Sequence, residues 1–327
     1  MKIIFRGFIA TVSVALACCA PAVSSAASAA QFPTKPVRLV VPYPPGGNTD
    51  VLARVLANQL TQAWGQQVIV DNRPGGNTVI GTELVARAQP DGYTLLFTTL
   101  TLTVLPSTQP KLPFDPVRDF TPVSLAVSLP NVLVVTPSLP VKSVSDLIRH
   151  AKANPGKLSY ASSGTGTSPH LSMELLKSLA GFDLTHVPYK GGAQTLVAVM
   201  SGETAAVFAG VPIVIPHAKS GKLRAIGVTS TKRSAALPDV PAIGETVKGY
   251  EVDTWFGLLA PAGTPREIVG LLHRSVAQAS QSSTVTTYLQ NEGAVPVAST
   301  PEQFQQHIRA EVKKWGDLMR KLGPQPQ

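Results

Sequence analysis

The sequence is poor in cysteine, in charge and in long apolar runs. It has 2 cysteines among 327 residues, Cys18 and Cys19, and both lie in an N-terminal stretch that looks like a secretion signal. Without that stretch no cysteine remains, which excludes disulfides, thiol catalysis and cysteine metal sites. Charged residues make up 14% of the chain, and no block of lysine or arginine resembles a nucleic-acid stripe or a polybasic membrane patch. No later run is long enough to cross a membrane.

The N-terminus has the three parts of a signal peptide. Lys2 and Arg6 give a positive region, residues 9–17 an apolar segment, and residues 24–30 a run of small residues. We expect residues 1–30 to be removed, which places the protein in the periplasm and lowers its formal net charge from +9 to +7. A membrane anchor fits less well because the apolar segment is short, and the residues before the two cysteines match a lipid-attachment site poorly.

Strand-like and helix-like segments alternate along the rest of the chain, which predicts an α/β fold with largely parallel sheets. The length suits two domains that share a cleft. Strands are expected at residues 37–41, 68–70, 94–98, 132–135, 158–161, 184–187, 205–208 and 223–229. Because no low-complexity linker divides the chain, we expect extended crossings between the domains near residues 125–130 and 251–255. Such crossings would act as hinges.

Helix starts are marked by capping residues. Ser143 begins a capping box with Asp146, Ser168 is followed by Pro169, and Thr264 and Thr300 each precede a proline. The last of these helices carries apolar residues at helical spacing.

Glycine-rich and threonine-rich turns stand between strand and helix signals. The clearest is residues 43–50, Tyr-Pro-Pro-Gly-Gly-Asn-Thr-Asp, between a strand at 37–41 and a helix at 51–60. Such a turn leaves backbone N–H groups unpaired at the positive end of a helix, where a carboxylate or phosphate can bind. An ordinary turn, with Thr49 or Asp50 as the helix cap, is the alternative. The pattern favours binding of a small anion.

No catalytic or metal-binding constellation is present. There is no Gly-x-Ser-x-Gly elbow, no complete phosphate loop, and no histidine pair one helical turn apart. His170, in the first turn of an expected helix, is interpreted as structural, and no cofactor or metal is indicated. A periplasmic hydrolase is therefore the weaker alternative, and the protein is not expected to be an enzyme.

From residue 32 to its end the chain resembles the Bug-type, TctC-like solute receptors of tripartite tricarboxylate transporters. The resemblance rests on short motifs in a fixed order and spacing. These are Tyr-Pro-Pro-Gly-Gly at 43–47, Asn-Arg-Pro-Gly at 72–75, Pro-Asp-Gly-Tyr-Thr-Leu-Leu at 90–96, Leu-Pro-Phe-Asp-Pro at 112–116, Asp-Phe-Thr-Pro-Val at 119–123, Ala-Asn-Pro-Gly-Lys-Leu at 153–158, Gly-Thr-Ser-Pro-His-Leu at 166–171, Val-Pro-Tyr-Lys-Gly at 187–191 and Trp-Phe-Gly-Leu at 255–258.

The resemblance implies a two-lobed periplasmic binding protein, each lobe a mostly parallel sheet flanked by helices. Residues 31–128 and 254–327 would form lobe 1, and residues 129–253 lobe 2. A cleft between the lobes would close over a small carboxylate, and integral-membrane transporter subunits would be the partners. A receptor that opens and closes needs no second copy, so a monomer is expected. A sensing receptor with a signalling partner would use the same fold and site.

The resemblance also implies a set of ligand contacts, made mainly by backbone amides, hydroxyls and ordered waters of the turn loops. In lobe 1 these are Tyr43, Gly46, Gly47, Asn48, Thr49, Thr98 and Thr99. In lobe 2 they are Ser163, Gly164, Thr165, Gly166, Thr167, Ser168, Tyr189, Lys190, Gly191, Ala209 and Gly210. From the residue types alone, Ser168 could instead cap its helix, and Lys190 could be a surface residue.

Two departures from the family pattern affect the expected ligand. Related receptors often carry an acidic residue after the phenylalanine that corresponds to Phe208, whereas here Ala209 and Gly210 follow. We therefore expect a ligand without a free amine, a di- or tricarboxylate or an aromatic acid, unless Asp50 or Asp253 neutralises an ammonium group. In the loop at 75–81 the glycines stand earlier than usual, which predicts a loop shape of its own.

Overall fold

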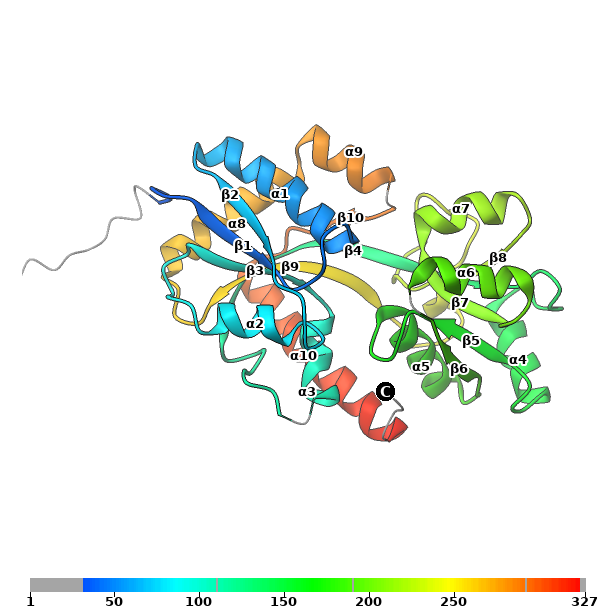
Figure 1. Cartoon of the computed structure of the whole chain (residues 1–327). Coiled ribbons are helices and arrows are strands. Elements are labelled where there is room, and N and C mark those ends of the chain that lie inside the picture. The colour runs from blue at the N-terminus through cyan, green and yellow to red at the C-terminus, as the bar shows by residue number, and fades with distance from the viewer. Residues whose placement is uncertain (1–31, 110, 190, 292, 324–327) are drawn as a thin grey trace, which may run out of the picture. The chain divides into compact units, whose positions relative to one another are not determined.

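One long strand, β4 (Phe120–Val135), belongs to two sheets and organises the fold (Figure 1). The structure is a computed structural model that describes residues 32–109, 111–189, 191–291 and 293–323, so the predicted signal at 1–30 lies outside the described residues. Residues 120–130 of β4 pair antiparallel with β9 (Asp253–Pro261). Residues 131–135 pair antiparallel with β7 (Ala206–Gly210) and β8 (Arg224–Val228). The switch between sheets falls between Pro130 and Asn131, at the end of the segment 125–130 where the sequence predicted a crossing.

The first sheet has the strand order β2-β1-β3-β9-β4. Its parallel strands are β1 (Val37–Val41), β2 (Val68–Asn72) and β3 (Thr94–Thr99). The strands β9 and β10 (Val295–Pro296) run antiparallel to their neighbours. In Figure 1, α1 (Asn48–Trp64), α8 (Arg266–Ser280) and α9 (Ser283–Asn291) lie on one side of this sheet. On the other side lie α2 (Val79–Ala86), α3 (Thr101–Thr108) and α10 (Pro301–Leu322).

The second sheet repeats this plan. Its parallel strands are β5 (Ser159–Ser162), β6 (Thr185–Pro188) and β7, and β4 and β8 complete it. In Figure 1, α6 (Gly192–Ser201) and α7 (Val211–Lys219) lie on one face, and α4 (Val144–Ala153) and α5 (Ser168–Ala180) on the other. A short 3-10 helix, η2 (Ile243–Glu245), packs beside β8. Each sheet and its helices form one lobe of a two-lobed α/β fold.

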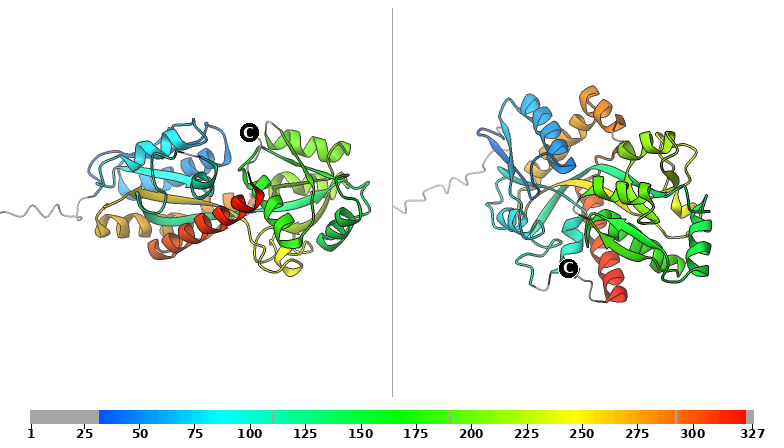
Figure 2. Two further views of the ribbon diagram at one scale, coloured as in Figure 1. Left: turned by 90° about the horizontal axis from the view of Figure 1, so that it is seen from below. Right: turned by 45° about the vertical axis from the view of Figure 1, so that its right-hand side comes forward.

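The buried core runs through both lobes. It includes Trp255 of β9 and Phe304 and Trp315 of α10, all fully buried. The ring of Trp255 meets that of Phe304 edge to face, with their centroids 5.3 Å apart. Seen from below in Figure 2, α10 crosses β4, and it contacts α3 and α5. This helix therefore supports the region where β4 passes from the first sheet to the second.

The sequence predicted the parallel strands of each sheet, but it did not predict the full length of β4. The strand contains two prolines, Pro122 and Pro130. The pairing register of β4 shifts beside Pro122, and Pro130 is the last residue paired with β9, so neither proline interrupts a regular ladder. The boundaries of the lobes at residues 128 and 253 stay a prediction.

Two of the four predicted caps are confirmed and two are wrong. The side chains of Ser143 and Thr300 accept the N–H groups of the residues three positions later. The N-cap of α5 is Thr167 rather than Ser168, because the Ser168 hydroxyl bonds to residues of β4 and β9. Thr264 hydrogen-bonds to the Pro261 carbonyl instead of capping α8. No helix among the described residues has the length and apolar character needed to cross a membrane.

Candidate functional site

Four helices, α1, α5, α6 and α7, start directly after strands and have no side chain that caps them. Their N-cap residues are Gly47, Thr167, Gly191 and Gly210. The N–H groups of each first turn have no partner within the helix, and the helix dipole adds partial positive charge there. Helices α2, α3 and α8 also lack such a cap, so this feature alone does not define a site. The sequence also predicted ligand contacts in the turn before each of these four helices, and at Thr98 and Thr99 directly before α3.

In lobe 1 a buried carboxylate shapes the turn before α1. One oxygen of Asp50 accepts the Gly46 N–H at 2.8 Å and the Arg54 side chain at 3.1 Å. The other accepts the Asn72 amide at 2.9 Å, and Asn72 also donates to the Tyr43 carbonyl. Although burial opposes ionisation, the bonds from Arg54, Gly46 and Asn72 lower the pKa of Asp50. The Gly46 amide, a predicted ligand contact, is thus already engaged by the protein itself.

Tyr43 and Thr99, both predicted contacts, meet in the structure. Their hydroxyl oxygens are 2.8 Å apart, so the end of β3 and the turn after β1 form one polar surface. The hydroxyl oxygens of Thr98 in β3, and of Thr78 and Thr82 at the start of α2, are buried without a hydrogen-bond partner among the described residues. Buried hydroxyls usually have partners, so these atoms suit ordered water or ligand.

The loop between β2 and α2 has the unusual shape that the sequence predicted. Gly75, Gly76, Asn77 and Thr78 have φ angles of 126°, 56°, 52° and 76°. Asn77 and Thr78 occupy this region despite their side chains, at a conformational cost of about 1 kcal/mol or more each. Gly81 has no room for a side chain, since a Cβ would lie 2.6 Å from the Arg73 carbonyl oxygen. Close packing of α2 against the turn after β2 therefore holds the loop.

In lobe 2 the predicted loop 163–168 is half-buried and glycine-dependent. Gly164 and Gly166 have φ angles of 122° and 79°, which favour glycine. The Thr167 hydroxyl donates to the Gly164 carbonyl at 2.6 Å, and Ser162 Oγ accepts the Gly164 N–H at 3.0 Å. The loop is closed on itself, and no side chain caps the start of α5.

Two histidines lie behind this loop. His170 Nδ1 accepts the Gly166 N–H at 3.3 Å, and His186 Nε2 lies 2.6 Å from Ser162 Oγ. The two rings are 4.6 Å apart between centroids. Burial lowers the pKa of His170 from 6.5 to about 3, and His186 and Lys177 add to the effect. Both imidazoles are thus neutral at physiological pH and support the loop. The sequence missed this pair because the residues are joined only by the tertiary fold.

Sequence reasoning also missed a polar contact near the point where β4 passes from one sheet to the other. Ser168 Oγ lies 2.6 Å from Thr254 Oγ1, and the Asn131 amide donates to Ser168 Oγ at 2.8 Å. Asn131 is in β4 and opposite Gly210, while Thr254 is in β9. The start of α5 is therefore bound to both crossing strands. A polar residue in an otherwise apolar strand, as Asn131 is, was the available signal.

The other predicted contacts are more dispersed. The Tyr189 hydroxyl donates to Glu203 at 2.8 Å, whereas its N–H bonds to the Ser162 carbonyl. Ala209 is buried, Gly191 is exposed, and Lys190 lies outside the described residues. Two surface hollows, one of about 650 Å³ beside α8 and α10 and one of about 560 Å³ beside β8, contain none of the predicted contacts in their walls. Among the described residues no group of three metal-binding side chains occurs.

The two acids considered for an ammonium group are placed differently from each other. Asp50 is fully engaged by the protein. Asp253 precedes Thr254 in β9, and successive side chains of a strand point to opposite faces. Because Thr254 bonds to Ser168, Asp253 points the other way, and its charged neighbours are Glu251, Glu311 and Lys314. Neither acid faces the predicted contacts of lobe 2.

A fold of two lobes joined by crossing strands defines the class of periplasmic binding proteins, and the comparisons agree. A family model described as "Tripartite tricarboxylate transporter family receptor" matches residues 52–324. The chain belongs to this family. Protein BugT of Bordetella pertussis is 39% identical over 306 residues, which cover 92% of this chain and 93% of BugT.

Solved structures support the same conclusion. The Rhodopseudomonas palustris protein Rpa4515, solved with adipate, is 39% identical, with a TM-score of 0.75 over 88% of this chain and 97% of its own. MatC of Rhodopseudomonas palustris, solved with bound malate, is 32% identical, with a TM-score of 0.73 over 88% of this chain and 100% of its own. The periplasmic binding protein BugD is 33% identical, with a TM-score of 0.73 over 90% and 100%.

Proposed function

We propose that the protein is a periplasmic receptor that captures a small carboxylate without a free amine and delivers it to the membrane subunits of a tripartite transporter. The observation that carries the proposal is the set of uncapped helix starts at the predicted contacts, one in lobe 1 and three in lobe 2. Each start offers N–H donors and partial positive charge, which a carboxylate accepts without a cationic side chain. A dicarboxylate can use one station in each lobe.

The hydroxyls around these stations support the same ligand class. Tyr43 and Thr99 are joined at the edge of the first sheet, and Thr98 has a hydroxyl without a partner among the described residues. Such groups bind carboxylate oxygens directly or through water. The site proposed here binds its ligand by hydrogen bonds and carries out no reaction. Two similar proteins were solved with dicarboxylates, one with adipate and one with malate, and they are precedents for this class of ligand.

The absence of an amine follows from where the acids lie. Ala209 and Gly210 supply no carboxylate at the end of β7, Asp50 is engaged by the protein, and Asp253 faces α10. Glu203 is exposed and already accepts the Tyr189 hydroxyl. An ammonium group that lost its hydration without an anionic partner would be costly to bind. The proposed ligand is therefore a dicarboxylate or tricarboxylate, or an aromatic acid.

The test is a thermal-shift screen of the purified secreted chain, followed by calorimetry. Adipate, malate, succinate, citrate and terephthalate form one set, and aspartate and glutamate form the other. A ligand at a thousandfold excess over its dissociation constant stabilises the folded state by about 4 kcal/mol. We expect a large shift with one amine-free acid. Tighter binding of aspartate or glutamate would show that the assignment of the ligand class is wrong.

Two glycine variants locate the binding site. Gly166 and Gly156 have φ angles of 79° and 70°, and a Cβ at either position meets nothing within 4 Å. Alanine therefore costs a similar backbone strain of about 1 kcal/mol at both positions. G166A should weaken ligand binding at least tenfold because it deforms the loop before α5. G156A, in the turn after α4, should leave binding unchanged, and equal losses in both variants would remove the loop from the site.

A further inference from the structure

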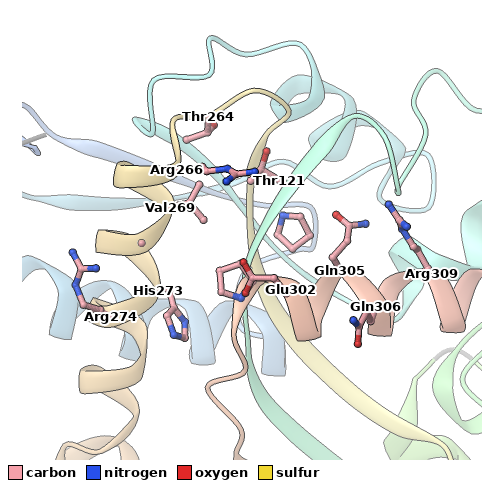
Figure 3. Close-up of a pocket in the computed structure, with 13 residues that line it drawn as sticks. Thr121, Thr264, Arg266, Val269, His273, Arg274, Glu302, Gln305, Gln306 and Arg309 are labelled. Atoms are coloured by element: carbon pink, nitrogen blue, oxygen red, sulfur yellow. The ribbon is translucent and has the colours of Figure 1, made fainter. Parts of the chain in front are cut away.

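A second polar groove lies in lobe 1, apart from the residues assigned to carboxylate binding. It has a volume of about 650 Å³ and lies between α8 and α10, beside the first residues of β4 (Figure 3). Its walls include Thr121 and Pro122, which pair with the end of β9. Thr254, which marks the predicted ligand site, pairs with Leu129 eight residues further along β4. At about 3.3 Å per residue the two places are roughly 25 Å apart.

Three arginines flank the groove and one acid lies among them. They are Arg266 and Arg274 of α8, Arg309 of α10 and Glu302 of α10. Each arginine is exposed, and no carboxylate among the described residues pairs with any of the three guanidinium groups. By contrast, other arginines such as Arg87 and Arg149 are paired with acids of their own helices. The groove therefore carries an uncompensated positive charge.

The arginines are spread along the groove rather than gathered at one point. Arg266 and Arg274 are eight residues apart on one helix, a rise of about 12 Å. In Figure 3 their side chains extend in different directions, and Arg309 stands at the other side of the groove. A small anion needs convergent donors, whereas this spacing matches carboxylates about four residues apart on an extended chain.

The floor of the groove favours a polypeptide. Thr121 and Pro122 are in the part of β4 that pairs with β9 on one side and with no other described strand. Gln305 Nε2 and His273 Nδ1, on walls of the groove, have no hydrogen-bond partner among the described residues. These two atoms are buried, so the strand edge is the part of the floor that suits the donors and acceptors of a peptide backbone.

We propose that this groove docks an extended acidic segment of a partner protein. The proposal goes beyond carboxylate capture and stands whichever solute the lobes bind. A receptor of a tripartite transporter has to contact the other components, and a surface far from the solute contacts can do so while the solute is held. Positive charge of the groove would steer the acidic segment and give the contact a strong dependence on salt.

The experiment measures fluorescence anisotropy of a short labelled peptide with two glutamates about four residues apart, at low ionic strength. The comparison is between the secreted chain, the variant R266Q/R274Q/R309Q and the control R87Q/R149Q/R320Q. The control removes the same charge from side chains that are 72%, 77% and 74% exposed and lie outside the groove. We expect the groove variant to lose at least tenfold in affinity and the control less than twofold. E302Q should bind the peptide more tightly.

Several results would overturn the proposal. Equal losses in both triple variants would indicate general charge attraction, and no preference of the parent protein for the acidic peptide over its glutamine counterpart would exclude docking. Competition by inorganic phosphate at the peptide's own concentration would indicate a small-anion site. Sedimentation that shows a dimer broken only by the groove variant would make the occupant a second copy. Solute binding by the groove variant is measured in parallel, so failure of carboxylate capture is distinguished from failure of docking.

Discussion

The turns before α1 and α5 both lead into helices without a side-chain cap, but they are supported by opposite kinds of side chain. In lobe 1 the charged carboxylate of Asp50 holds the turn through Gly46 and Asn72. In lobe 2 the neutral imidazole of His170 accepts the Gly166 N–H. The carboxylate uses up donors and adds negative charge, whereas the imidazole leaves the start of α5 positive. For the carboxylate ligand that we propose, this difference predicts a larger electrostatic attraction from lobe 2 than from lobe 1.

Replacement of Asp50 tests the charged support of the lobe 1 turn and should give the largest loss of stability. D50N leaves Arg54 without its ion pair and places an amide opposite the donors of Gly46 and Asn72. Breaking a buried, multiply bonded charge costs about 2–4 kcal/mol. Urea unfolding should show this loss. The control D317N breaks exposed ion pairs of α10 and should cost at most about 1 kcal/mol.

The neutral imidazole of His170, which supports the lobe 2 turn, predicts that the free energy of unfolding depends on pH. The pKa of His170 falls from 6.5 to about 3 on folding, so the unfolded chain binds an extra proton between these values. Stability is therefore fully present above pH 6.5 and falls toward about pH 3, by up to about 1.4 kcal/mol per pH unit. H170N should flatten this slope in unfolding experiments at several pH values, whereas H150Q should not. An unchanged slope in H170N would show that His170 is not held neutral.

The contact between Ser168 and Thr254 links the lobe 2 turn to a crossing strand. Each of S168A and T254V should cost about 1 kcal/mol of stability, and the double variant should cost less than their sum because both remove one hydrogen bond. Affinity for the carboxylate should fall in both single variants, since the bond positions the start of α5. Strictly additive effects would mean that the two hydroxyls act separately.

The sequence predicted the turns between strands and helices well, but it did not predict the distant side chains that hold these turns in place. Turns such as residues 43–50 depend on glycine, proline and threonine within a few positions, so local chemistry reveals them. The contact Asn131–Thr254 joins two residues that are 123 positions apart in the sequence, and the contact Ser168–Thr254 joins two that are 86 positions apart. The ring pair of His170 and His186 likewise depends on how α5 packs on β6. Such pairs require the tertiary fold, and no spacing in the sequence shows them.

The same limit applies to charged residues. Asp50 looked like a helix cap or a partner for an ammonium group, and only the positions of Arg54 and Asn72 show that it is engaged. Arg266, Arg274 and Arg309 had no distinguishing sequence pattern. They gather at one groove because α8 and α10 lie on either side of the β4 edge.

Replacement of Asp253 should give the smallest change in stability. The pH dependence of stability that Asp253 causes has the opposite sign to that caused by His170. Burial raises the pKa of Asp253, and Glu251 and Glu311 add to the rise. The folded state therefore holds its proton at a pH where the unfolded chain has lost it, so stability is lost as pH rises from 3.8 through the folded-state pKa. D253N removes this loss and should stabilise the protein by up to about 1 kcal/mol at neutral pH, as measured by urea unfolding. Since Asp253 faces α10, carboxylate affinity should stay unchanged in D253N, and a marked loss of affinity would place this acid in the binding site after all.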